Sequence, residues 1–144
     1  MIDAAAIAET TAHDRARHRA LGCFLSLAVG DAVGTTVEFK PRGSFPPLMG
    51  MVGGGPFGLL PGQWTDDTSM AVCLAESLLD HPQLNERDLM DRFVRWWRPG
   101  ENSATGHCFD IGITTAAALG RYQRTGNPVA GDTSPDAAGN GSVM

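Results

Sequence analysis

The sequence predicts an all-α protein, and three observations point to that class. Apolar residues recur at helical spacing in four stretches of the 144-residue chain: roughly 14–36, from Thr68 to a stop at His81-Pro82, 86–98 and 109–122. No stretch shows the apolar and polar alternation of a strand, and no internal repeat is present. The length is sufficient for one hydrophobic core. We therefore expect one helical domain over residues 14–144, preceded by a loose leader at 1–13.

The first expected helix combines small residues at every fourth position with one buried-looking acid. The small residues are Gly22, Ser26, Gly30 and Gly34. Each glycine lowers helix propensity by up to about 1 kcal/mol relative to alanine, so close packing against another helix is the expected compensation. Asp31 lies among apolar residues, where a carboxylate is costly without partners. It is either a structural acceptor of hydrogen bonds or part of a site with Glu38, which lies seven residues later.

The segment Thr65-Asp66-Asp67-Thr68 places two carboxylates at the start of the second expected helix. Two interpretations are open. Aspartate and threonine are preferred capping residues, and the helix dipole stabilises negative charge there by about 0.3–1 kcal/mol. Carboxylate and hydroxyl oxygens are also ligands of hard divalent cations such as Mg²⁺ or Mn²⁺. The long Pro/Gly-rich loop at 40–63 and the adjacent Trp64 favour a partly shielded site.

The two later helices have recognisable ends. Asn85 is the expected N-cap of the third helix, whose Trp96 and Trp97 we expect on the buried stripe rather than as a platform for stacked bases. A Gly-Asn-Pro stop follows the fourth helix. Two polar residues lie near its start, His107 and Asp110. Each could either cap the helix or take part in catalysis or ligand binding.

Composition narrows the functional classes. A net charge of −5 and a pI near 5.2 argue against nucleic acid or an anionic membrane as the main partner. Three cysteines without a CxxC spacing suit buried free thiols in a reducing compartment. The acidic N-terminus lacks the basic region of a signal peptide, and no apolar run approaches the roughly 18 residues of a membrane span. These features predict a cytoplasmic protein.

Four ordered segments together resemble the ADP-ribosylglycohydrolase family, including the dinitrogenase reductase-activating glycohydrolases. They are the Gly22–Gly34 segment with Glu38-Phe39, the Gly62–Thr68 segment, Phe109-Asp110-Ile111-Gly112, and Gly139-Asn140-Gly141-Ser142-Val143-Met144. They cover nearly the whole chain from residue 20. The resemblance implies an all-α multi-helix orthogonal bundle with two Mg²⁺ or Mn²⁺ ions. It also implies an enzyme that cleaves the glycosidic bond between ADP-ribose and an acceptor on a protein or small molecule.

The resemblance also implies roles for individual residues. Thr65, Asp66 and Asp67 match metal ligands of the family, and Glu38 matches an acidic residue at the metal site. Glu38 and Asp67 are then the catalytic candidates. The loop formed by Gly139, Asn140, Gly141 and Ser142 matches the one that binds the diphosphate and ribose. Asp31 and Asp110 match motif positions, for which we expect a structural or supporting role.

One departure from the family concerns length. Family members are longer, and an Asp-x-Asp-Thr group from their C-terminal half completes the metal site, whereas this chain has no such group. We therefore expect the chain to be the N-terminal part of such a domain and to carry half of the active site. A missing C-terminal half or self-association would supply the rest. The alternative is a non-catalytic or degenerate fragment that serves, if at all, as a binding or structural module.

Overall fold

The computed structural model describes the backbone of residues 4–139 and the side chains of residues 13–139. Four α-helices and two short 3-10 helices make up its regular structure: α1 (Ala4–Gly34), η1 (Thr35–Val37), α2 (Asp66–Asp80), α3 (Glu86–Trp97), α4 (Ile113–Thr125) and η2 (Pro135–Ala137). Within the described residues the only β pairing is an isolated bridge between Gly54 and Leu59. The predicted all-α class is confirmed.

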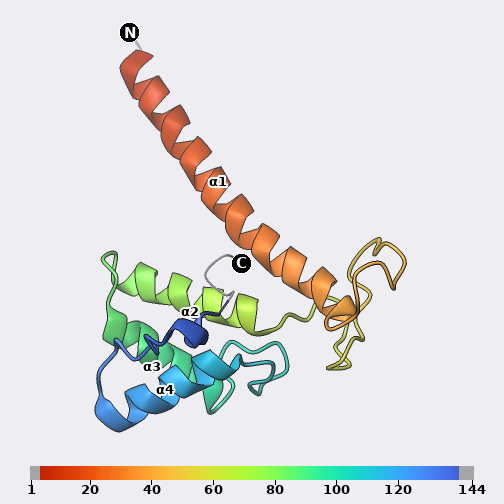
Figure 1. Ribbon diagram of the computed structural model, residues 1–144. Coiled ribbons are helices and arrows are strands. Elements are labelled where there is room, and N and C mark those ends of the chain that lie inside the picture. Colours follow the sequence, from red (N-terminus) through yellow and green to blue (C-terminus); the bar gives the residue numbers. More distant parts are fainter. Residues whose placement is uncertain (1–3, 140–144) are drawn as a thin grey trace.

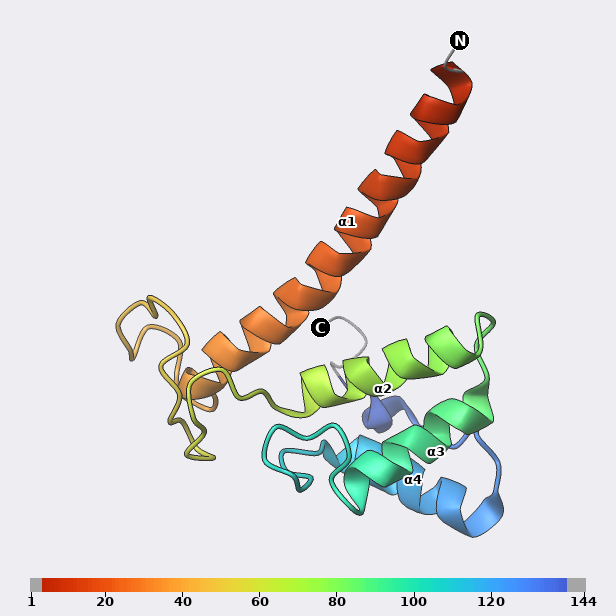
Figure 2. The same ribbon diagram turned by 180° about the vertical axis from the view of Figure 1, so that it is seen from behind.

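The helices form two parts that meet at one end of α1. α2, α3 and α4 pack as one group, in which α3 lies against both α2 and α4 (Figure 1). α1 stands away from this group for most of its length and approaches α2 only through its C-terminal end (Figure 2). The loop between Glu38 and Thr65 surrounds this meeting point. The N-terminus of α2 therefore lies beside the last turns of α1.

α1 is longer than the sequence predicted. The helix begins at Ala4, so residues 4–13 continue it instead of forming a separate leader. Its apolar side chains are largely uncovered, with Leu25 60% exposed and Val29 49% exposed. Cys23 is also exposed, which contradicts the expectation that all three thiols are buried; Cys73 is buried and Cys108 is half-buried.

The segment His13–Val37 is long and apolar enough to cross a membrane when only length and composition are considered. The expectation that no segment reaches this length was therefore wrong. A single such helix near an N-terminus is weak evidence for a span, because core helices of other proteins pass the same test.

The interface between α2 and α3 holds the best-defined core. Trp96 of α3 is 1% exposed and Cys73 of α2 is also 1% exposed. At the edge of this interface, Arg92 of α3 forms ion pairs with Glu76 and Asp80 of α2 and with Asp88 of its own helix. Such a network fixes the relative position of the two helices more firmly than one exposed pair would. The expectation that Trp96 belongs to the core is confirmed.

Asn85 is the N-cap of α3, as predicted, and its side chain accepts a hydrogen bond from the backbone N–H of Asp88 at 3.2 Å. We expect Asn85→Ala to lower the free energy of unfolding by about 1 kcal/mol, because the substitution removes this acceptor from the first turn. Urea denaturation followed by circular dichroism measures the effect. Asn85→Asp, which keeps a side-chain acceptor, should stay close to the parent, and equal loss in both variants would contradict a capping role.

α4 begins at Ile113, four residues later than the predicted start at 109. The reason is the backbone of Asp110, whose φ of 57° lies in the left-handed region that interrupts a right-handed helix. Asp110 is therefore neither within α4 nor its N-cap, which is Gly112. The predicted end is confirmed: Gly126 closes the helix in the left-handed conformation with φ of 69°.

Candidate active site

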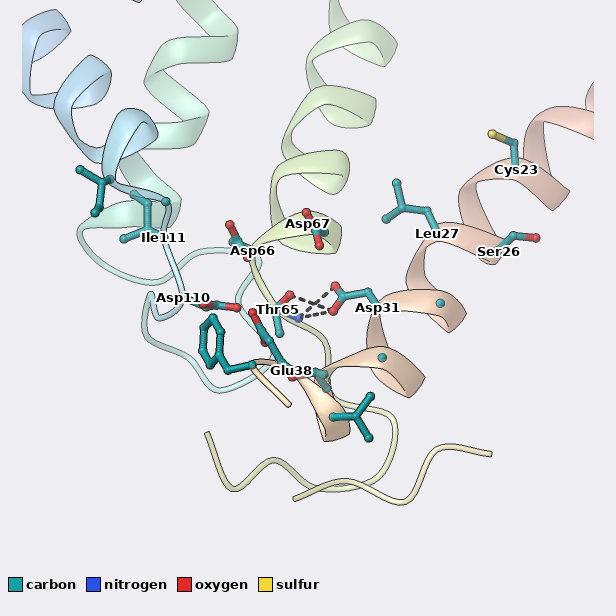
Figure 3. Close-up of a pocket in the computed structure, with 17 residues that line it drawn as sticks. Cys23, Ser26, Leu27, Asp31, Glu38, Thr65, Asp66, Asp67, Asp110 and Ile111 are labelled. Atoms are coloured by element: carbon teal, nitrogen blue, oxygen red, sulfur yellow. Dashed lines mark hydrogen bonds between the residues drawn. The ribbon is translucent and has the colours of Figure 1, made fainter. Parts of the chain in front are cut away.

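Asp31 joins the end of α1 to the start of α2. Its carboxylate accepts hydrogen bonds from the backbone N–H of Thr65 at 3.0 and 3.1 Å and from the backbone N–H of Thr68 at 3.1 Å. It also accepts from the hydroxyl group of Thr65 at 2.8 Å (Figure 3) and from that of Thr68 at 2.6 Å. A carboxylate that satisfies free N–H groups at a helix start is an N-cap, here supplied by another helix.

This contact bears on the two interpretations of the acidic pair. Thr65 occupies the N-cap position of α2, but its side chain makes no capping hydrogen bond. Asp66 and Asp67 lie in the first turn, where the helix dipole still favours their charge. Because Asp31 provides the cap, their carboxylates are not required for it. They line a cavity instead (Figure 3).

The cavity has a volume of about 990 Å³ and brings together segments far apart in the sequence. One wall is the C-terminal half of α1, from Cys23 to Gly34, and the opposite wall is the start of α2 with the segment before α4. Five carboxylates from these segments line it: Asp31, Glu38, Asp66, Asp67 and Asp110. No lysine or arginine is among the described residues that line this cavity.

Burial, followed by the repulsion between neighbouring negative charges, raises the pKa values of Glu38, Asp66, Asp67 and Asp110. Burial raises the pKa of Asp66 to about 7, and the negative charges of Asp110 and Asp67 add to the effect. Burial also raises the pKa of Asp67, together with the charge of Asp31. For Glu38, burial is again the main cause of a raised pKa, followed among the raising effects by the charge of Asp66. The site thus carries more negative charge than its surroundings neutralise.

The side chains of Glu38 and Asp110 lie next to each other in this cavity (Figure 3). Burial raises the pKa of Asp110 to about 7, and the negative charge of Glu38 contributes further.

The structure brings most of the sequence-predicted residues to one place. Glu38, Thr65, Asp66 and Asp67 share the cavity with the two supporting candidates, Asp31 and Asp110. Gly139 lies near α4, where a Cβ atom built on it would be 3.3 Å from Thr114 Oγ1. The other predicted members of the substrate loop, Asn140, Gly141 and Ser142, lie outside the described residues. His107 is not among the residues that line the cavity.

Sequence reasoning singled out Trp64 but did not predict the hydrogen bonds that attach it and Gln63 to the loop before α4. Trp64 Nε1 donates to the carbonyl oxygen of Asn102 at 3.3 Å, and Gln63 Nε2 donates to that of Ala104 at 3.0 Å. Asn102 lies in a polar connection that resembles an ordinary loop. Its left-handed φ of 64° is a property of the fold that residue spacing does not reveal.

The donor chemistry of the cavity fits a hard divalent cation, because carboxylate and hydroxyl oxygens face a region of uncompensated negative charge. The hydroxyl of Thr65 donates its proton to Asp31, so its lone pairs remain available to a ligand. However, no three acidic, histidine or cysteine residues in the described part of the chain already converge closely enough to hold an ion. The described residues thus supply suitable donors but not a closed coordination shell.

The chain is thus an all-helical protein whose acidic, oxygen-lined cavity lies at the N-terminus of α2. The sequence profile described as ADP-ribosylglycohydrolase matches residues 12–144. The chain belongs to the ADP-ribosylglycohydrolase family.

Individual relatives agree with this assignment. The chain is 51% identical over 126 residues to the ADP-ribosylarginine hydrolase Tri1 of Serratia proteamaculans, covering 88% of this chain and 34% of that protein. It is 40% identical over 130 residues to the ADP-ribosyl-[dinitrogen reductase] glycohydrolase of Rhodospirillum rubrum, covering 88% of this chain and 42% of that protein.

A solved structure supports the same fold. The chain resembles one described as an ADP-ribosylglycohydrolase-related protein complex, with a TM-score of 0.66 and 52% identity over 78% of this chain and 35% of the other. Across these comparisons the chain spans about a third to two fifths of the length of the relatives it matches.

Proposed function

We propose that this chain carries one part of the active site of a metal-dependent hydrolase that removes ADP-ribose from a modified arginine side chain. One observation supports this proposal: the side chains of Glu38, Thr65, Asp66 and Asp67 line the same cavity. The hydroxyl of Thr65 is held in position there by its hydrogen bond to Asp31. The arginine acceptor is inferred from the relatives in Serratia proteamaculans and Pseudomonas putida, each named as an ADP-ribosylarginine hydrolase. The excess of carboxylates also suits a cationic guanidinium group.

Thr65, Asp66, Asp67 and Glu38 would hold Mg²⁺ or Mn²⁺. When bound, such ions orient a ribose hydroxyl and a water molecule and lower the pKa of that water. The chain's own part is to present oxygen donors in fixed positions. Asp31 achieves this for Thr65, because it accepts both the backbone and the hydroxyl hydrogen of that residue.

Cleavage of the N-glycosidic bond requires a base on one side of the ribose carbon and a proton for the leaving nitrogen. As the C–N bond breaks, water forms the new C–O bond at the ribose carbon, and a carboxylate, Asp67 or Glu38, would take the proton that this water loses. The leaving guanidine nitrogen would then receive that proton, so the carboxylate returns to its charged form. Both carboxylates lie in the same cavity, so one site can hold the water and the ribose together.

The decisive assay measures free ADP-ribose released from an ADP-ribosylated arginine peptide by the 144-residue chain with Mg²⁺ or Mn²⁺. We expect release to depend on metal, to stop in EDTA and to be lost in Asp67→Asn. If the chain holds only part of the site, release should require addition of the remaining segment of a family member. Absence of release under both conditions, with a full-length relative active in parallel, would favour the alternative of a binding or structural module.

A further inference from the structure

Two hydrogen bonds connect the residues before the acidic pair to the loop that leads to Asp110. The indole N–H of Trp64 donates to Asn102 O at 3.3 Å, and the amide of Gln63 donates to Ala104 O at 3.0 Å. Trp64 immediately precedes Thr65, the N-cap of α2. These bonds therefore join the two chain segments that form the same wall of the cavity and carry Asp66, Asp67 and Asp110.

Asn102 is itself fixed to α2. Its side-chain amide donates to Glu76 Oε2 at 3.0 Å, and Glu76 in turn pairs with Arg92 of α3 at 3.2 Å. The left-handed φ of 64° at Asn102 is a conformation that asparagine tolerates better than most residues. The loop is thus attached to the helix body at the same residue that receives the Trp64 hydrogen bond.

The loop between Asn102 and Asp110 is held together internally. Ser103 Oγ donates to His107 O at 2.6 Å, and Thr105 Oγ1 donates to the same oxygen at 3.1 Å. Gly100 packs so closely on this turn that no side chain would fit at its position. Because the loop has few internal degrees of freedom, the position of Asn102 sets the position of Asp110.

We propose that Trp64 and Asn102 form a positioning clamp that fixes Asp110 relative to the carboxylates at the start of α2. The inference rests on the proposed function, because a fixed distance between the two segments matters only if their carboxylates hold metal and substrate together. The clamp acts through Asp110 and touches neither ligand. Trp64 is a positioning residue, and the aromatic ring itself does not take part in the reaction.

The test uses Trp64→Phe, which removes the indole N–H and keeps an aromatic ring. It is combined with Asp110→Asn in a double-mutant cycle on the 144-residue chain, with Mn²⁺ affinity measured by calorimetry. We expect each single variant to weaken Mn²⁺ binding about tenfold, as is typical for a group that orients ligands. The double variant should be no weaker than Asp110→Asn alone, because Trp64 acts only through Asp110. Trp97→Phe, which removes an indole on α3, is the matched control and should bind as the parent does.

Hydrogen exchange supplies a readout that needs no metal. In Trp64→Phe, the hydrogen-bonded amides of Ser103 and Gly106 should exchange about tenfold faster, while that of Cys73 in α2 should not change. Unchanged loop exchange would overturn the clamp, as would additive losses of affinity in the double variant. If the parent binds no Mn²⁺ even after the remaining segment of a family member is added, the metal-dependent function fails, and the exchange result alone decides whether the clamp exists.

Discussion

Asp31→Ala should lower the free energy of unfolding by about 3 kcal/mol, the largest stability effect that we expect from one substitution in this chain. The substitution removes the acceptor of all hydrogen bonds from Thr65 and Thr68 and leaves their buried donors without a partner. A charged hydrogen bond contributes about 1.5–3 kcal/mol, and part of the loss is recovered when water enters. Urea denaturation monitored by circular dichroism measures the change.

Two further variants show whether the loss comes from the cap. Asp14→Ala removes an exposed carboxylate from the same helix and should change stability by less than about 0.5 kcal/mol. Asp31→Asn keeps the size of the side chain but replaces one acceptor oxygen with a donor, so it should lie between the parent and Asp31→Ala. If Asp31→Ala were as stable as the parent, α2 would not depend on α1 for its N-cap.

Asp66→Asn should have effects of opposite sign on stability and on metal binding. The pKa of Asp66 is raised to about 7 in the folded chain, so the folded state binds this proton more tightly than the unfolded state. The associated stability is present below about pH 4 and is lost as pH rises through about 7. Asparagine carries no charge at any of these pH values. We therefore expect the metal-free variant to be more stable than the parent at pH 8 by about 1–2 kcal/mol, a value reduced for solvent screening.

The same substitution should weaken Mn²⁺ binding at least about tenfold, because it removes a charged oxygen ligand. Denaturation at pH 5 and pH 8 without metal, followed by calorimetry with Mn²⁺ at pH 8, separates the two effects. Glu101→Gln, which changes an exposed carboxylate paired with Arg95 away from the cavity, is the control and should leave metal affinity unchanged. Equal Mn²⁺ affinity in Asp66→Asn and the parent would contradict a ligand role.

The helices could be predicted from the sequence because their apolar spacing and end signals are local. Asn85 caps the start of α3 and Gly126 caps the end of α4, both as predicted, because a cap depends on the residues beside it. The start of α4 was missed because the backbone of Asp110 is left-handed, with φ of 57°, and this conformation is set by how the preceding loop packs. Local propensity does not record such long-range contacts.

The candidate site shows the same division. The residue types at 65–67 pointed to oxygen ligands, and Asp31 was recognised as a carboxylate that needed partners. The sequence could not predict that the partners of Asp31 are Thr65 and Thr68. This contact depends on the end of α1 lying beside the start of α2. The hydrogen bonds of Gln63 and Trp64 likewise cross about 40 residues of sequence, 41 and 38 respectively.

Asp31 joins α1 and α2 directly. The outer part of the loop between these helices, near residues 43–50, is therefore not needed to hold them together. Ser44 bonds only to the nearby Pro41 among the hydrogen bonds of the described residues, and Met49 is 93% exposed. Insertions, deletions or a backbone nick near residues 43–50 should therefore leave the geometry of the carboxylates intact. This outer part of the loop can therefore vary in sequence and length without disturbing the carboxylates of the cavity.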